Sequence, residues 1–363
     1  MTTLASVAAR IDAVTPQRRD RTVDGLRAFA IAGVVLGHWL VSAVVSAPDQ
    51  PMALHGDSPL RHAQWYAPAT WLLETLGLFF AAAGYAAARG LADRPALPWL
   101  RARLTRLLPP VLALAAVWLP ALGLLRLVGS PDSTRHLVLS LVSHPLWFLL
   151  VYAVLTACAP LLVRCPPWAV VVAVAAIAGT DALRPHGLPT WLGLIAVPVG
   201  WAAPYLCGTA LAAGRLRREH GLALLALGVV GGAALVALGY PASAVGVPGD
   251  RWSNLDPPSL FALAVAAAQF GVFLVVRPSL ARMLARPRYW LPVATLNLAA
   301  MTVFCWHQTA LLLVTFTALP TGRPPGLLDA PSGLWPLYRL LWLPVFATVL
   351  VGLARTFHRF ERR

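Results

Sequence analysis

The sequence predicts an all-α, polytopic integral membrane protein with about ten transmembrane helices and both termini in the cytoplasm. The 363 residues are 58% hydrophobic and only 12% charged, and the mean hydropathy is +0.69; soluble proteins carry about twice that charged fraction. All 29 cationic residues are arginines, and they gather on alternate sides of the hydrophobic runs. This composition excludes an ordinary soluble enzyme, a disordered chain and, despite the net charge of +15, a nucleic-acid-binding protein.

Ten hydrophobic stretches approach the length of about 18 residues that crosses about 30 Å of hydrocarbon. They are 25–46, 68–90, 104–127, 137–163, 167–181, 190–213, 221–239, 259–276, 292–318 and 335–354. The fifth stretch is short, but if it did not cross the membrane, every later loop would lie on the opposite side of the membrane. The first twenty residues contain arginines and no apolar run, so we expect no cleavable signal peptide and an uncleaved first span.

The arginines test this topology. With the N-terminus inside, 21 arginines fall on inner segments, five on outer loops and three within spans, as the positive-inside rule requires. We therefore expect a cytoplasmic segment at 1–22, a ten-helix membrane domain at 23–355 and a basic cytoplasmic tail at 356–363. No soluble domain fits in the short loops, so the protein must act inside the bundle or at its two faces.

The first span carries the most informative polar residues: Asp24, Arg27 and His38. Arg27 and His38 are eleven residues apart, which returns them to within about 20° of one helix face, about 16 Å apart along the axis. Asp24 lies one turn before Arg27, where we expect it to hold the guanidinium. This stripe of polar side chains along one helix face suits a ligand with an anionic head near the cytoplasm and a reactive tail inside the membrane. The alternatives are a buried histidine bonded to a carbonyl and a topogenic arginine.

Three further ionisable residues fall at a similar depth when counted along their helices: Glu74, His144 and His307. Ionisable side chains within spans are costly and usually face a cavity or a partner, which makes each a candidate functional residue. Glu74 also fits the interfacial start of its helix. For His144, which precedes Pro145, we favour a structural role.

The inner loop after the second span holds a cluster formed by Arg101, Arg103 and Arg106. Three guanidinium groups at a helix N-terminus are able to bind phosphates, although such a cluster also serves as ordinary topogenic charge. The four cysteines lack metal-ligand spacing, so we expect no metal. Phosphate-binding glycine loops and the nucleophile elbow of serine hydrolases are missing too, which argues against an ATP-driven pump, a nucleotide-dependent redox enzyme and a serine hydrolase.

The chain resembles the membrane-bound acyltransferase family 3, in an actinobacterial-type form without an extra soluble domain. The matching segments are Arg21 to Arg27 followed by His38 (R-x10-H), Phe79-Phe80 to Gly84-Tyr85, Arg103-x-x-Arg106, His144 to Phe148, Arg251 to Pro258 and Met301 to His307. Two positions depart from the family pattern: Ala83 replaces a common serine, and the segment Tyr205 to Gly208 replaces one that carries a histidine.

The resemblance implies transfer of an acyl group, usually acetyl from acetyl-CoA, to a hydroxyl of an extracytoplasmic glycan, lipid-linked sugar or secondary metabolite. His38 would act as general base or as a transient acyl carrier, assisted by His307 or Glu74. This function places the protein in a bacterial cell membrane.

For the other site residues the resemblance implies binding roles. The phosphates of CoA would bind Arg101, Arg103, Arg106 and Arg27, with Asp24 positioning Arg27. Tyr85 and Trp147 would shape the acyl tunnel.

Two other functions remain open from the residues. Buried His, Glu and Arg side chains also suit a proton-coupled transporter or flippase, although the R-x10-H stripe occurs only once, without an inverted repeat. The second is a sensor or scaffold in which the polar groups serve packing. Hydrolysis of acetyl-CoA by the purified protein would separate an enzyme from both.

Overall fold

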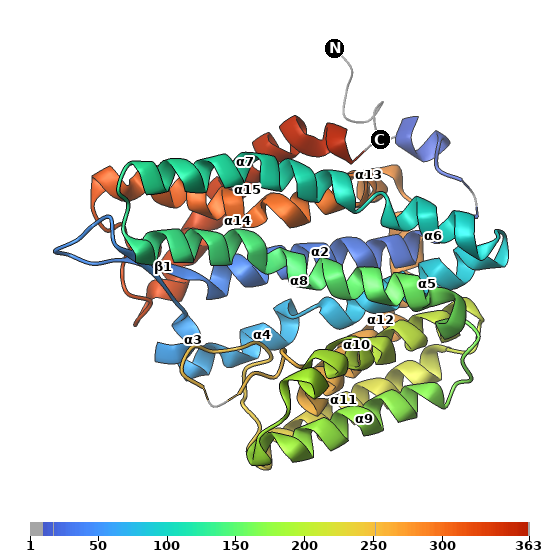
Figure 1. Cartoon of the computed structure of the whole chain (residues 1–363). Coiled ribbons are helices and arrows are strands. Elements are labelled where there is room, and N and C mark those ends of the chain that lie inside the picture. Colours follow the sequence, from blue (N-terminus) through green and yellow to red (C-terminus); the bar gives the residue numbers. More distant parts are fainter. Residues whose placement is uncertain (1–9, 17, 251, 362–363) are drawn as a thin grey trace.

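The fold is an almost wholly helical bundle (Figure 1), seen in a computed structural model that describes residues 10–16, 18–250 and 252–361. Within these residues ten long apolar segments are able to cross a membrane, which confirms the predicted fold class. They contain α2 (Arg21–Val41), α4 with α5 (Ala67–Leu73, Leu76–Ala92), α6 with α7 (Ala96–Leu104, Leu108–Leu127), α8 (Asp132–Leu162), α9 (Ala169–Leu183), α10 (Thr190–Ala212), α11 (Arg218–Ala237), α12 (Leu260–Leu284), α14 (Ala300–Ala318) and α15 (Trp335–Phe357).

The shorter elements lie at the ends of these segments. They are β1 (Ala43–Ser46), β2 (Leu54–Asp57), α3 (Pro59–His62), α13 (Pro287–Leu298) and the 3-10 turns Gln64–Tyr66, Arg184–His186, Leu319–Thr321 and His358–Phe360.

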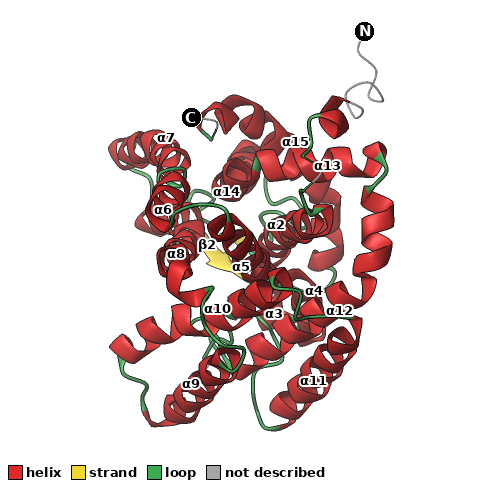
Figure 2. Cartoon of the chain, turned by 90° about the vertical axis from the view of Figure 1, so that its right-hand side faces the viewer, coloured by secondary structure: helices red, strands yellow, loops and turns green. Residues whose placement is uncertain are grey.

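The helices differ in how deeply they are buried. Viewed along the bundle, α2 and α5 lie near the centre, whereas α9 and α11 lie at the edge (Figure 2). Of the ten segments, the one containing α14 is the most buried. The outer helices expose large apolar side chains, among them Leu124, Val230 and Leu341. Such surfaces suit contact with lipid, where only helices with internally satisfied backbones are stable.

The bundle has two distinct ends. At one end, the hairpin end, α2 runs into the strands β1 and β2. At the opposite end, the arginine end, α2 begins and α6 carries Arg101 and Arg103 (Figure 1). Both ends of the described chain meet the arginine end. Trp290 of α13 donates to Thr15 at 3.0 Å, and the Glu361 carboxylate accepts the backbone N–H groups of Met301 and Thr302, at the start of α14.

The first span begins and ends earlier than the sequence predicted, at 21–41 instead of 25–46. Helix α2 ends at Val41, and residues 43–46 form the buried strand β1, antiparallel to β2, instead of continuing the helix. The β-branched pair Val44 and Val45 favours a strand once a partner is available. As a consequence His38 lies in the last turn of α2.

Two other spans are interrupted. The second breaks at Glu74 and Thr75, between α4 and α5, so Glu74 is not the interfacial start of its helix. Gln269 of α12 donates to the carbonyls of Trp71 and Glu74, both at 2.8 Å, and so satisfies groups that the break exposes. The ninth span begins at Ala300, because the chain changes direction at Ala299 after α13; the predicted start at 292 was therefore too early.

Candidate active site

A cavity of about 640 Å³ occupies the hairpin end of the bundle. Its walls come from α2, α4, α8 and α14, together with β2 and the loop before α12. The polar and aromatic residues among its lining are His38, Ser42, Asp57, Ser58, Tyr66, Thr70, Glu74, Ser140, His144, Trp147, Phe148, Ser253, Asp256, Phe304 and Gln308. Its volume lies within the range of small-molecule sites, about 300–1,000 Å³.

Three histidine rings meet at the base of this cavity. The His38 ring centroid lies 5.1 Å from that of His144 and 5.0 Å from that of His307. The backbone is fixed here because the indole N–H of Trp39 donates to the His307 carbonyl at 2.9 Å. His38 and His144 line the cavity, whereas His307 is fully buried behind them.

The two nitrogens of His307 have different surroundings. Nδ1 lies 2.7 Å from the Phe304 carbonyl oxygen, so it carries the proton and donates. Nε2 is buried and has no hydrogen-bond partner among the described residues. His307 therefore packs against the His38 ring and is not among the residues that line the cavity.

Glu74 contributes a carboxyl group to the cavity wall. The break between α4 and α5 presents this side chain inward, and one of its oxygens accepts the backbone N–H of Leu76 at 3.3 Å. Thr75, the next residue, donates its hydroxyl to the Ala30 carbonyl of α2 at 2.7 Å, which ties the break to the helix that carries His38.

Arginines line two smaller pockets at the other end of the bundle. One, of about 230 Å³, contains Arg94, Arg103 and Arg106 beside Trp99. The other, of about 500 Å³, contains Arg89, Arg94 and Arg164. Arg101 lines neither pocket and is exposed. The placement also corrects the prediction of a helix N-terminus: Arg101 and Arg103 lie in the last turn of α6, where cations complement the helix dipole.

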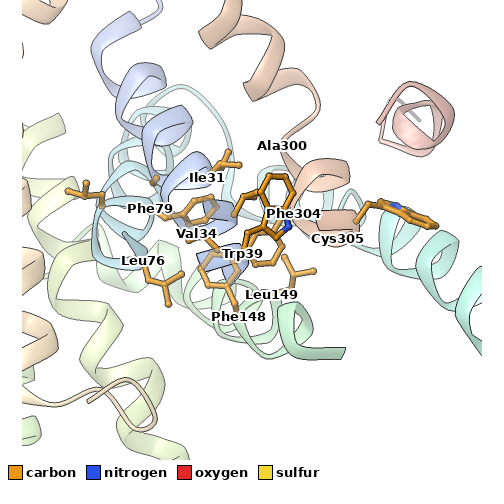
Figure 3. Packing of buried hydrophobic residues seen from close by; sticks show 14 of the residues in the cluster. Ile31, Val34, Trp39, Leu76, Phe79, Phe148, Leu149, Ala300, Phe304 and Cys305 are labelled. Atoms are coloured by element: carbon orange, nitrogen blue, oxygen red, sulfur yellow. The ribbon is translucent and has the colours of Figure 1, made fainter. Parts of the chain in front are cut away.

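Three phenylalanines, Phe79, Phe148 and Phe304, form an aromatic seam between Arg27 and the cavity. The Arg27 guanidinium lies 5.9 Å from the centroid of the Phe79 ring. Phe79 packs against Phe148 at 4.9 Å, and Phe148 against Phe304 at 4.8 Å. These three phenylalanines, the aromatic seam, are labelled in Figure 3.

A family model described as an acyltransferase domain matches residues 20–355 of the chain. The chain belongs to acyltransferase family 3. It is a multi-pass membrane enzyme that transfers acyl groups. No significant match was found among curated proteins or among solved structures.

Asp24 of this acyltransferase does not hold Arg27, contrary to the sequence expectation. It pairs with Arg19, whose Nε and Nη2 donate to its two carboxylate oxygens at 2.5 and 3.0 Å. No ion pair of Arg27 is found among the described residues.

Tyr85 and Trp147 lie at opposite ends of the bundle. Trp147 lines the cavity, whereas the Tyr85 hydroxyl donates to Asp20 at 3.0 Å at the arginine end. Asp20 also caps α2 and pairs with Arg277 at 2.6 Å. Burial alone would raise the pKa of Asp20, but the hydrogen bonds from Thr22, Arg277 and Tyr85 and the charge of Arg277 together lower it.

Gln308 and Asp256 escaped notice in the sequence, and His144 was assigned to structure alone. Gln308 follows His307 in an apolar helix. Because a polar side chain within a span costs free energy, its presence there was a usable signal. His144 carries the same signal, but its neighbour Pro145 favoured a structural interpretation. Asp256 lies in a loop, within the segment Arg251 to Pro258 that resembles the family, but the residue itself was not singled out. In the structure all three line the cavity of the acyltransferase. No group of three or more metal-ligating side chains is placed to bind a metal within the described residues.

Proposed function

We propose that this acyltransferase moves an acyl group, in the simplest case acetyl, from cytoplasmic acyl-CoA to a hydroxyl group of an extracytoplasmic glycan, lipid-linked sugar or secondary metabolite. In this proposal the arginine end and both termini face the cytoplasm of a bacterial cell. The observation that carries the proposal is the separation of two kinds of site. His38 lines a cavity at one end of α2, and arginine-lined pockets lie at the other end of the bundle.

The arginine pockets support an acyl-CoA donor. CoA carries a diphosphate and a further phosphate, and guanidinium groups bind phosphates through paired, charge-assisted hydrogen bonds. Arg94 lines both pockets, between Arg103 and Arg106 on one side and Arg89 on the other. Adjoining pockets of this kind suit a ligand with several phosphates better than a single phosphate ion.

The acyl end of the donor has to reach the cavity along the bundle. On α8, Pro160 lines one arginine pocket and Phe148 lines the cavity, about 18 Å apart along the helix. The aromatic seam lies on this path, so Phe148 has to move aside for the thioester to pass. A closed seam would protect the thioester from hydrolysis when no acceptor is bound.

His38 is the proposed general base. It takes the proton from the acceptor hydroxyl while the hydroxyl oxygen attacks the thioester carbonyl carbon. A carbon–oxygen bond forms, the carbon–sulfur bond breaks, and the CoA sulfur leaves as a thiolate that receives the proton from the imidazolium. Transfer through an acyl-histidine would use the same ring as nucleophile.

The cavity walls support a hydroxylated acceptor. Asp57, Glu74 and Asp256 offer carboxylate oxygens for hydroxyl hydrogen bonds, and Trp147 offers an aromatic face for the apolar side of a sugar-like ring. Asp57 is already bonded to His62 at 2.8 Å, whereas Glu74 accepts only a longer bond from the Leu76 N–H at 3.3 Å, so Glu74 and Asp256 are the stronger candidates.

Binding and slow hydrolysis of radiolabelled acetyl-CoA test the proposal, with detergent-purified wild type beside His38→Ala. We expect saturable binding by both proteins and hydrolysis by the wild type alone, because the substitution removes the base but leaves the arginine pockets intact. Saturable binding with equal hydrolysis by both proteins would refute the role of His38. Folded wild type that does not bind acetyl-CoA would refute the donor and favour a transporter.

A further inference from the structure

Gln308 is the polar partner of His38. Its Nε2 lies 3.1 Å from Nδ1 of His38, and the Gln308 side chain is buried, with 1% of the residue exposed. In this arrangement the amide N–H donates to Nδ1, which must carry a lone pair, so the ring proton of neutral His38 is on Nε2. Since Nδ1 is engaged with Gln308, Nε2 is the nitrogen left for a ligand in the cavity.

This resting tautomer is the wrong one for a general base. A base at Nε2 needs a lone pair there, and the ring proton must then be on Nδ1. A proton on Nδ1 requires an acceptor where the Gln308 amide N–H now donates. The side chain of Gln308 contains such an acceptor, its Oε1 atom.

Oε1 of Gln308 is free to take over this position. It is buried and has no hydrogen-bond partner among the described residues. Turning the amide by about 180° therefore breaks only the contact to His38, and it replaces that contact with one of opposite polarity. Rotation about the terminal torsion of a glutamine is a soft motion with two broad minima.

We propose that Gln308 is a positioning residue that switches His38 between two tautomers by rotation of its amide group. With Nε2 toward Nδ1, as in the structure, His38 rests in a form that cannot take a proton at Nε2. With Oε1 toward Nδ1, water in the cavity that His38 lines takes the proton from Nε2 and a proton from water returns at Nδ1, so that His38 presents the Nε2 lone pair to the acceptor hydroxyl. The same Oε1 contact then stabilises the imidazolium until its Nε2 proton passes to the CoA thiolate. This inference rests on the proposed role of His38 as general base.

Two substitutions separate a switch from a packing role. Gln308→Met keeps the volume but can neither donate to nor accept from Nδ1. Gln308→Glu offers only carboxylate oxygens, which hold the proton on Nδ1. We expect Gln308→Met to lower kcat for acetyl-CoA hydrolysis by roughly tenfold or more with KM unchanged, since a wrong histidine tautomer costs far more in serine proteases. Gln308→Glu should stay within a few-fold of wild type.

Thr315→Val is the matched control. Thr315 lies on the same helix, is fully buried, and its hydroxyl has no partner among the described residues, so its removal should leave kcat unchanged. A purely structural role for Gln308 predicts the opposite ranking, because a buried charge in Gln308→Glu would harm packing more than methionine does. Full activity of Gln308→Met, or loss of activity in Gln308→Glu alone, would overturn the proposal.

A second measurement does not depend on activity. Nitrogen-15 NMR of histidine-labelled protein reports which ring nitrogen carries the proton, with the His38 signal assigned by its absence in His38→Asn. We expect the Nε2–H form in wild type and the Nδ1–H form in Gln308→Glu. The same tautomer in both proteins would refute the switch, even if acyl transfer itself were established. A switch seen by NMR in a protein without acyl-CoA hydrolysis would refute only the proposed reaction.

Discussion

Arg339 and Trp39 are joined by a buried hydrogen bond, in which Nε of Arg339 donates to the Trp39 carbonyl at 2.7 Å. The same guanidinium donates to the carbonyls of Ser42 at 2.6 Å and Gly326 at 2.9 Å, and Arg339 is fully buried. Trp39 follows His38 in the chain. Arg339, which lies within α15, therefore fixes the C-terminal end of α2 next to His38.

Arg339→Met should destabilise the protein strongly. It leaves three carbonyls without their charged donor, and each buried unpaired group costs about 1–3 kcal/mol. We expect a clearly lower Tm in detergent and a lower kcat, because the last turn of α2 loses its anchor. Arg126→Met, which replaces an exposed arginine within another span, is the control and should leave both unchanged. Equal Tm values for the two variants would contradict the anchoring role.

Arg103→Gln and Arg106→Gln should each weaken acetyl-CoA binding. Loss of one charge-assisted hydrogen bond, worth about 1.5–3 kcal/mol, raises Kd by about tenfold to a hundredfold. Arg101→Gln tests whether the pocket or the overall positive charge matters, since Arg101 lies on the same helix as Arg103 but outside both pockets. Titration with labelled acetyl-CoA should show little change for Arg101→Gln. Equal weakening by all three substitutions would favour general electrostatic attraction.

Gly84→Ala and Gly208→Ala should disrupt the contact between α5 and α10. A Cβ atom at Gly84 would lie 1.9 Å from the Tyr205 carbonyl oxygen, and one at Gly208 would lie 1.9 Å from the Ala81 carbonyl oxygen. Backbone atoms cannot move aside as side chains do, so we expect a loss of at least about 1–3 kcal/mol, the usual cost of overpacking. Gly123→Ala on α7 meets nothing within 4 Å and should be neutral in the same thermal unfolding assay.

Asp20→Asn should lower stability in a pH-dependent way. The pKa of Asp20 is lowered in the folded protein, so its charge contributes stability above the unfolded pKa of about 3.9. That contribution is lost as the pH falls through the lower, folded pKa. Asparagine still caps α2 but loses the charge that faces Arg277. We expect a lower Tm than wild type at pH 7, with the two curves converging toward pH 3. A constant difference across this range would exclude the charge as the cause.

Local patterns predicted the helical part of the fold well. The length of each hydrophobic run depends only on neighbouring residues, so the ten spans were visible in the sequence. The β1–β2 hairpin was not, because Val44 and Val45 are as apolar as a helix continuation and become a strand only through pairing with Gly56 and His55. The break at Glu74 was hidden for a similar reason: it is stabilised by Gln269, far along the chain.

The candidate site was predicted only in part. The spacing of Arg27 and His38 marked the first span as the one with the most informative polar residues, and the cost of ionisable groups within a span drew attention to Glu74 and His307. The expected pairing of Asp24 with Arg27 was wrong. Asp24 pairs with Arg19, which precedes α2, whereas the expectation considered only residues one helical turn apart.

The sequence by itself determined the number of crossings, the family and the helix that carries His38, because hydrophobic length and residue spacing are local properties. Only the tertiary structure decided what surrounds that histidine. His144 comes from α8 and Gln308 from α14, and they reach His38 through packing between helices whose contacts follow from side-chain shape across the bundle. The partner of Nδ1, and with it the tautomer of His38, is therefore a property of the folded bundle.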